Sequence, residues 1–202
     1  MKEKVSIILT GVGGQGVITA ASILGKAAVN ADVTVYVSEV HGMAQRGGSV
    51  VCSVRMGRVS SPLVASGTAD VIVSTEPVEA LRSICYAHPE TMVITDTTPM
   101  VPFTVAVGED TYPSLESVFE ELKRNARLFP IDGLGIAKDA GAIITKNIVM
   151  LGGLAATQKL PFKSDILLKT ILDTVPKDYE KTNKQAYQGG KQAIAKLLKT
   201  TK

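Results

Sequence analysis

The feature that most constrains the fold is a glycine motif placed between an apolar segment and a helical one. Gly11, Gly13 and Gly16 match the pattern G-x-G-x-x-G. The β-branched run 5–9 precedes the motif, and residues 17–29 carry apolar side chains at helical spacing. Glycine permits the tight turn and close backbone approach that join a strand to a helix. The segment therefore predicts a strand, a glycine turn and a helix.

The rest of the chain continues to alternate strand-like and helix-like segments. Further strands are expected at 33–37, 49–56, 70–74, 92–95 and 127–131, and further helices at 76–82, 118–126, 147–160, 164–175 and 178–198. Pro130 confines the last strand to an edge, because proline cannot donate a ladder hydrogen bond. The alternation predicts an α/β fold with a Rossmann-like, mostly parallel sheet flanked by helices, with further helices at the C-terminal end. We expect one domain over residues 1–202, with a helical tail from about residue 145 to 202.

Composition narrows the classes of function. Of the 202 residues, 45% are hydrophobic and 20% are charged, a balance that excludes a disordered chain. Aromatic residues make up 4% and the net charge is +3, so the chain lacks the stacking residues and basic runs of a nucleic-acid-binding protein. The uncharged stretch 5–25 is long enough to cross a membrane, but its clustered glycines would weaken such a helix. We expect no nucleic-acid partner and no membrane segment.

The two cysteines, Cys52 and Cys85, are isolated from each other in the sequence. Neither belongs to a C-x-x-C pair, so this chain alone cannot build a zinc or iron–sulfur site. A disulfide framework is equally unsupported, which suits a cytoplasmic protein. We expect both to be small, half-buried apolar side chains.

Three interpretations of the first glycine motif remain open at this point. The free N–H groups at the helix start favour an anion, as in dinucleotide binding, and Glu39 follows the second expected strand, where such a site places an acid. The glycines can equally serve only the close packing of strand and helix. The same amides can also bind a phosphate of another cofactor or an acidic group of a partner. Gly14 and Gln15 are not required by dinucleotide binding, and Gln15 can point an amide at a bound group.

A second glycine-rich segment, residues 39–48, lies between the second and third expected strands. Its polar and glycine positions include Glu39, His41, Gln45, Arg46, Gly47 and Gly48. Loops that leave the carboxyl ends of parallel strands line one crevice, so we expect the two glycine segments to face each other across a cleft. Arg46 is suited to bidentate binding of a phosphate or carboxylate, and His41 can titrate near neutral pH. The alternative is a surface loop whose charges are solvated.

The sequence offers no catalytic set of its own. It contains only two histidines, His41 and His88, and His88 precedes a proline in an expected turn. A nucleophile–base pair is missing, so a hydrolytic triad is not supported, and clustered carboxylates for a metal are missing as well. We assign no catalytic and no metal-binding residue.

The two glycine motifs together resemble those of a known family. Residues 9–17 are Leu-Thr-Gly-Val-Gly-Gly-Gln-Gly-Val, and residues 41–50 are His-Gly-Met-Ala-Gln-Arg-Gly-Gly-Ser-Val. In this combination, and in length and order along nearly the whole chain, they resemble the gamma-type subunit of 2-oxoacid:ferredoxin oxidoreductases. The Met-Ala-Gln-Arg-Gly-Gly form is most similar to the small (beta) subunit in the indolepyruvate:ferredoxin oxidoreductase branch.

The resemblance implies that the complete enzyme oxidatively decarboxylates an aryl 2-oxoacid, with indolepyruvate expected, and forms an acyl-CoA. Electrons pass to ferredoxin. Thiamine diphosphate, magnesium and 4Fe-4S clusters belong to the large (alpha) partner subunit, and coenzyme A is a co-substrate. This chain would then bind no cofactor by itself and would be inactive alone.

The residues expected to line a crevice at the interface with the large subunit are Gly11, Gly13, Gly14, Gln15, Gly16, Glu39, His41, Gln45, Arg46, Gly47 and Gly48. The crevice would bind coenzyme A, another phosphate-bearing group, or a loop of the large subunit. The alternative function is a free-standing Rossmann-type oxidoreductase that uses NAD or a flavin.

Overall fold

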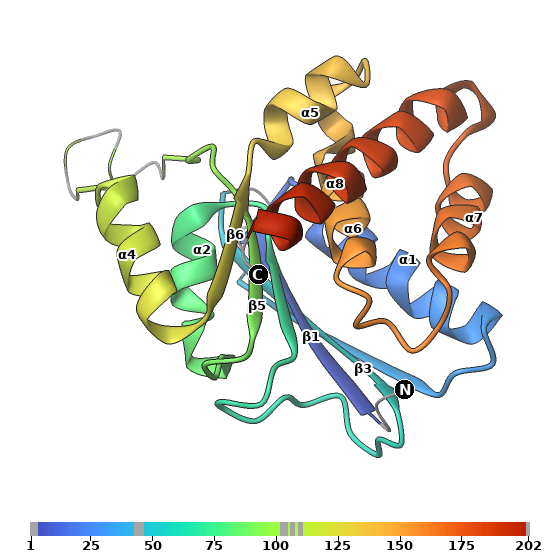
Figure 1. The fold of residues 1–202 in the computed structure, drawn as a ribbon, viewed down its shortest axis with the longest axis horizontal. Coiled ribbons are helices and arrows are strands. Elements are labelled where there is room, and N and C mark those ends of the chain that lie inside the picture. Colours follow the sequence, from blue (N-terminus) through green and yellow to red (C-terminus); the bar gives the residue numbers. More distant parts are fainter. Residues whose placement is uncertain (1–3, 43–46, 102–104, 106–107, 109–110, 201–202) are drawn as a thin grey trace.

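The computed structural model describes all residues except 1–3, 43–46, 102–104, 106–107, 109–110 and 201–202. The described residues form a six-stranded sheet in the order β2-β3-β1-β4-β5-β6 (Figure 1). Its strands are β1 (Lys4–Val12), β2 (Val35–His41), β3 (Ser49–Gly57), β4 (Val71–Ser74), β5 (Met92–Asp96) and β6 (Arg127–Ile131). The strands β1, β4, β5 and β6 pair in parallel, whereas β3 is antiparallel to both of its neighbours, β1 and β2. Five strands therefore run in one direction, and the expected mostly parallel α/β sheet is confirmed.

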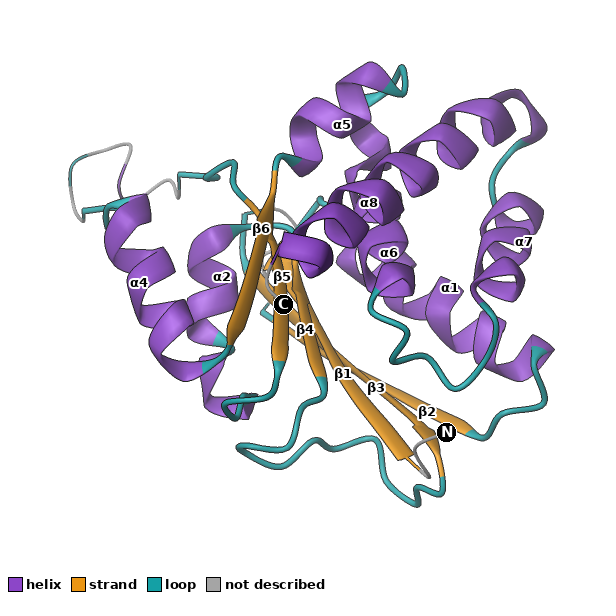
Figure 2. Ribbon diagram, in the orientation of Figure 1, coloured by secondary structure: helices purple, strands orange, loops and turns teal. Residues whose placement is uncertain are grey.

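Helices cover both faces of the sheet. They are α1 (Val17–Asn30), α2 (Pro77–Arg82), α4 (Leu115–Asn125), α5 (Gly133–Asp139), α6 (Lys146–Ala156), α7 (Ser164–Thr174) and α8 (Glu180–Thr200), with short 3-10 turns η1 (Ile84–Tyr86), η2 (Ile143–Thr145) and η3 (Lys177–Tyr179). Figure 2 shows α1, α6, α7 and α8 on one face, and α2 and α4 on the other. No helix among the described residues is both long and apolar enough to cross a membrane.

The central strand β1 contributes to the core on both faces of the sheet. Ile7 and Leu9 pack in the cluster that includes α1, α6 and α8, whereas Ile8 packs in the cluster under α2 and α4. This two-sided burial explains why residues 5–9 form a continuous apolar run rather than an alternating one. Because β1 contributes to the hydrophobic clusters on both faces of the sheet, it lies at the centre between the two layers of helices.

The direction of winding reverses between β1 and β4. The helix after β1, α1, lies on one face, and the helix after β4, α2, lies on the other. The loops that follow these neighbouring strands therefore diverge and leave a crevice at their carboxyl ends, which is the usual ligand-binding position in an open α/β sheet. The first glycine motif follows β1 and so lies at this point.

Several local expectations differ from the structure. The strand β1 continues through Val12, so the glycine turn is shorter than expected, and β2 begins at Val35, two residues later than the expected start at residue 33. No element was expected at residues 132–139, but α5 forms there, because the Asp132 side chain caps it by accepting a hydrogen bond from Gly135 N at 2.7 Å. The expected edge strand that contains Pro130 is confirmed as β6.

Two glycines allow α6 and α8 to pack backbone against backbone. A Cβ atom at Gly152 would overlap the carbonyl oxygen of Tyr187, and one at Gly190 would overlap that of Val149. The obstacle is main chain in both cases, so a side chain cannot be accommodated by a rotamer change. This contact fixes α6, whose first residues form one wall of the crevice.

We predict that Gly152→Ala lowers the free energy of unfolding by about 1–3 kcal/mol, because the added methyl group forces α8 away from α6. Urea denaturation measures this change. Gly42→Ala is the matched control, since a Cβ there meets nothing within 4 Å, and its effect should stay below about 1 kcal/mol. Equal stabilities for Gly152→Ala and wild type would contradict the close packing.

Candidate functional site

The two glycine segments lie side by side and are joined by backbone hydrogen bonds. Gly13 N donates to Gly48 O at 2.7 Å, and Gly47 N donates to Gly13 O at 3.2 Å. The antiparallel β3 is the cause, because its first residue, Ser49, lies opposite Val12 at the end of β1. The segments thus form one continuous rim and do not face each other across a cleft.

The other expected residues of the second segment are separated by the structure. Glu39 lies within the edge strand β2, opposite Cys52, and lines a groove beside α1 rather than the crevice. His41 ends β2 and does line the crevice, with its Nε2 atom 3.9 Å from the Glu39 carboxylate. Gln45 and Arg46 lie outside the described residues. Because β3 separates β2 from β1, the acid expected of a dinucleotide site is not beside the glycine turn.

The crevice has a volume of about 930 Å³. From the first motif it is lined by Gly13, Gly14, Gln15 and Gly16, together with the first turn of α1. The opposite wall comes from residues that are distant in the sequence, namely Met100, Leu134, Ile143, Ile144, Lys146 and Asn147. Gly11 is not part of the lining; a Cβ at Gly11 would overlap the Thr75 hydroxyl, so this glycine serves close packing.

Two helices begin at the crevice without a counter-charge. Gly16 is the N-cap of α1 at a φ of 76°, and neither α1 nor α6 has a side-chain cap or an acid in its first turn. Asn147 in the first turn of α6 donates from its amide to Gly16 O at 3.2 Å, which ties the two helix starts together. The free N–H groups at the start of α1 and the positive ends of both helix dipoles favour an anion at this position. At the start of α6 two N–H groups are already bonded, Lys146 N to Ile143 O and Ile148 N to Asn147 Oδ1.

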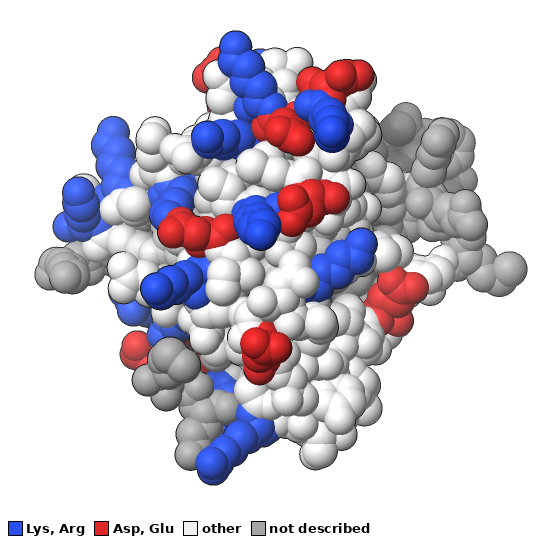
Figure 3. Space-filling model, turned by 90° about the vertical axis from the view of Figure 1, so that its right-hand side faces the viewer, with Lys and Arg blue, Asp and Glu red and all other residues white. Residues whose placement is uncertain are grey.

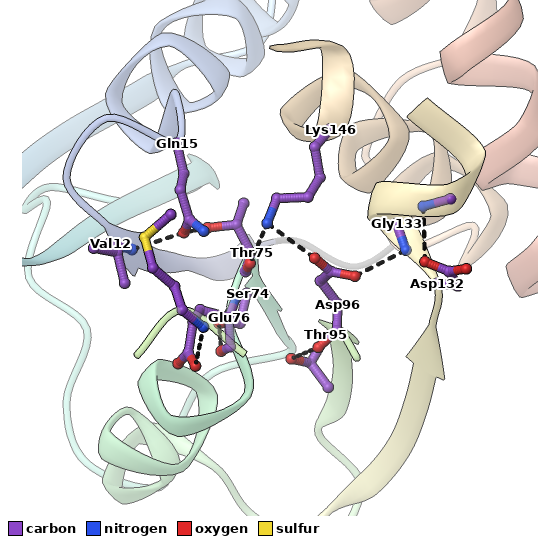
Figure 4. Close-up of polar contacts among 12 residues, drawn as sticks. Val12, Gln15, Ser74, Thr75, Glu76, Thr95, Asp96, Asp132, Gly133 and Lys146 are labelled. Carbon is purple, nitrogen blue, oxygen red and sulfur yellow. Dashed lines mark hydrogen bonds and ion pairs between the residues drawn. The ribbon is translucent and has the colours of Figure 1, made fainter. Parts of the chain in front are cut away.

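Gln15 holds the glycine turn with one end of its amide. Its Oε1 accepts hydrogen bonds from Val12 N at 2.9 Å and from the Thr75 hydroxyl at 2.6 Å (Figure 4). Its Nε2 atom is buried and has no hydrogen-bond partner among the described residues. A buried donor without an acceptor costs free energy, so this amide is suited to a ligand with acceptor oxygens.

A buried ion pair forms the floor of the crevice. Lys146 Nζ donates to Asp96 Oδ2 and to Thr75 O, both at 2.9 Å, and Asp96 Oδ1 accepts from Gly133 N at 2.9 Å (Figure 4). The side chains of Lys146 and Asp96 are 11% and 0% exposed. These bonds connect the start of α6 to the carboxyl ends of β4 and β5. Reasoning from the sequence missed this pair, although a lysine directly before an apolar helical segment is a visible signal.

Two acids hold the start of β3 and the start of α2. Glu76 caps α2 by accepting from Glu79 N at 2.9 Å, and its other oxygen accepts from the Tyr112 hydroxyl. Glu79 accepts from the Ser49 hydroxyl and lies 3.3 Å from Arg82. Burial raises the pKa of the Glu79 carboxyl above its ordinary value, against the opposing effects of Ser49 and Arg82. The hydrogen bond to Glu79 anchors Ser49, the residue that follows the second glycine segment.

The cysteines do not match the expectation that both are half-buried. Cys52 is buried in β3, where burial and the nearby Glu39 raise the pKa of its thiol to about 11, whereas Cys85 is exposed. Within the described ranges, no three His, Cys, Asp or Glu side chains are grouped closely enough to hold a metal ion.

We predict that Lys146→Met lowers the free energy of unfolding by about 3–5 kcal/mol, because it leaves the buried Asp96 carboxylate without its cation. The double variant Lys146→Met/Asp96→Asn should recover more than half of that loss, since a neutral amide can still accept from Gly133 N. Urea denaturation of the two variants measures the coupling. A loss smaller than about 1 kcal/mol in the single variant would show that the pair is not buried as described.

We predict a pH dependence from Glu79. Above its ordinary pKa of 4.5, the unfolded chain releases the proton of Glu79 before the folded chain does, so the stability contributed by this group falls as pH rises through its raised folded pKa. Glu79→Gln removes this effect. Its stability relative to wild type should therefore increase as the pH rises above 4.5, as measured by thermal unfolding at a series of pH values.

Ser49→Ala provides the complementary variant for Glu79. The Ser49 hydrogen bond lowers the pKa of Glu79, so removing it should make the total loss of stability with rising pH larger than in wild type and extend it to higher pH. Parallel pH curves for all three proteins would refute the role of Glu79.

Comparisons with known proteins agree with the motifs. The profile of the family described as pyruvate ferredoxin/flavodoxin oxidoreductase matches residues 6–193. The chain is 42% identical to indolepyruvate oxidoreductase subunit IorB of Pyrococcus horikoshii and 40% identical to that of Thermococcus kodakarensis, in each case over 98% of this chain and 99% of the relative. A solved 2-oxoglutarate:ferredoxin oxidoreductase from Magnetococcus marinus shares the fold, with a TM-score of 0.72 at 23% identity, over 98% of this chain and 32% of that chain. The chain therefore belongs to the pyruvate ferredoxin/flavodoxin oxidoreductase family.

Proposed function

We propose that this chain is the small subunit of a 2-oxoacid:ferredoxin oxidoreductase that converts an aryl pyruvate, with indolepyruvate as the first choice, to its acyl-CoA. The support is the identity of 40% and 42% to two subunits named IorB, along nearly their whole length. In this proposal residues 1–202 act as one domain in the cytoplasm, together with a large subunit and, through the complex, with ferredoxin. The alternative of a free-standing NAD or flavin enzyme is not favoured, because β3 keeps Glu39 away from the glycine turn.

The redox and thiamine chemistry is assigned to the large subunit. The described residues of this chain do not fit an iron–sulfur cluster, since Cys52 is buried in β3 and Cys85 lies in η1 on another part of the fold. Thiamine diphosphate with magnesium and 4Fe-4S clusters would supply decarboxylation and electron transfer in the partner. The small subunit would contribute a binding site and not a reacting group.

The crevice is the proposed site for the phosphate-bearing part of coenzyme A. The observation that carries this proposal is the convergence of the uncapped start of α1, the positive end of α6, the unpartnered Gln15 Nε2 and the glycine turn on one cavity. Backbone N–H groups at a helix start bind phosphate without side-chain help. The solved Magnetococcus marinus enzyme has coenzyme A bound, which supports this class of ligand. Arg46, which lies outside the described residues, stays a proposed cation for this phosphate on the basis of the sequence alone.

We predict that Thr19→Asp raises the KM for coenzyme A at least roughly tenfold, equivalent to about 1.4 kcal/mol, in the complex reconstituted with the large subunit. Thr19 is exposed, lines the crevice and lies in the first turn of α1. A carboxylate there favours the helix but occupies the place of an anion. The assay uses indolepyruvate, phenylpyruvate and pyruvate, and the small subunit alone should be inactive with all three.

Ser117→Asp is the matched control for Thr19→Asp. Ser117 is exposed in the first turn of α4, on the other face of the sheet, so the same charge change should leave the KM for coenzyme A unaltered. If Thr19→Asp assembles normally and also keeps the wild-type KM, the crevice does not bind coenzyme A.

A further inference from the structure

The exposed apolar side chains of this protein are concentrated on one surface. Eleven large hydrophobic side chains are exposed among the described residues. Six of them line either the crevice or the adjoining groove of about 510 Å³ between α1 and β2. These six define what we call the apolar band: Ile18, Val29, Val37, Met100, Ile143 and Ile144. Ile18 lines both hollows, so the band is continuous.

The band ends at an unprotected sheet edge. The strand β2 is the last in the sheet order, and no described strand pairs with its outer side. Tyr36 and Val40 on this strand are also exposed, at 41% and 68%. Natural edge strands are usually guarded by charged side chains, especially lysine, by proline or by a bulge. The strand β2 contains neither lysine nor proline, and Glu39 is its one acidic side chain. The exposed apolar side chains beside this unpaired edge are suited to a polypeptide that covers them.

Charged side chains are unevenly spread over one side of the molecule. Figure 3 shows the side of the molecule where α1 and α7 lie in Figure 1, with charged side chains in rows across its upper half and few of them at its lower right. Large exposed apolar patches mark interaction sites in soluble proteins, and lasting interfaces are more apolar than transient ones. The band is therefore suited to a permanent partner.

We propose that the apolar band and the outer edge of β2 form the docking face for the large subunit, which closes the mouth of the crevice. This inference depends on the proposed function: if the crevice holds coenzyme A, the crevice must open onto the subunit in which the acyl group is formed. The domain of the Magnetococcus marinus enzyme that matches this chain is 32% of a longer chain, so in that protein the same fold is covalently continuous with other parts of the enzyme.

The occupant is the large subunit and not a second copy of this chain. Pairing of β2 with the β2 of a second copy would satisfy the sheet edge, but it would not account for the exposed isoleucines Ile143 and Ile144 at the crevice mouth. A partner that covers both hollows buries the band and excludes water from the bound phosphate. A partner strand added to β2 would supply the missing backbone hydrogen bonds.

The test measures the affinity of the small subunit for the purified large subunit by calorimetry, without substrate. Ile144→Asp and Val37→Asp place a charge at side chains that are 80% and 44% exposed, so the fold of the free chain is retained. Each should weaken binding by roughly tenfold or more. Leu63→Asp is the matched control, because Leu63 is 70% exposed and lies outside the band, and its affinity should stay within about twofold of wild type.

Wild-type affinity in both band variants would overturn the proposal. A second result would also overturn it: the isolated chain forms a dimer in sedimentation experiments, Val37→Asp separates this dimer, and the large subunit still binds the variant with wild-type affinity. This experiment measures subunit assembly, so it is independent of the coenzyme A measurement. If Ile144→Asp loses binding to the large subunit while Thr19→Asp keeps the wild-type KM, the proposed docking face is supported and the proposed coenzyme A site is rejected.

Discussion

The backbone pairing between Gly13 and the pair Gly47 and Gly48 is the contact on which the whole site depends. It exists because β3 runs antiparallel to β1, so its first residue lies opposite the last residue of β1. If β3 ran parallel, Ser49 would begin at the other end of a nine-residue strand, about 30 Å away. The reversed strand therefore turns two distant glycine segments into one rim, and it also displaces β2 to the sheet edge.

The attraction of the crevice for an anion comes from the backbone rather than from Lys146. The charge of Lys146 is compensated by Asp96 at 2.9 Å, and the desolvation cost of such a pair offsets most of its attraction. The starts of α1 and α6 each contribute about half a positive charge and meet no acid in their first turns. The buried pair accordingly determines where α6 begins, and the two helix starts determine which charge is preferred there.

Residue spacing and the preferences of glycine and proline were sufficient to predict the parts of this fold that depend on residues close in sequence. They predicted β1, the glycine turn and α1, and they placed β6 at an edge from Pro130 alone. They could not predict that β3 would separate β1 from β2, because strand order is decided by pairing between distant segments. Lys146 and Asn147 were missed for the same reason: Asn147 contacts Gly16 across 131 positions of sequence. The helix α5 was missed because Asp132-Gly133 has the composition of a turn.

A site built from backbone N–H groups recognises a phosphate but not the molecule that carries it. Selectivity for the remainder of a ligand requires side chains that close over the crevice, and at its mouth this chain supplies mainly exposed apolar groups such as Ile143 and Ile144. Burial of these groups under another surface lowers the free energy of the system. The same exposure that leaves the crevice unselective thus provides a driving force for the proposed partner to cover it.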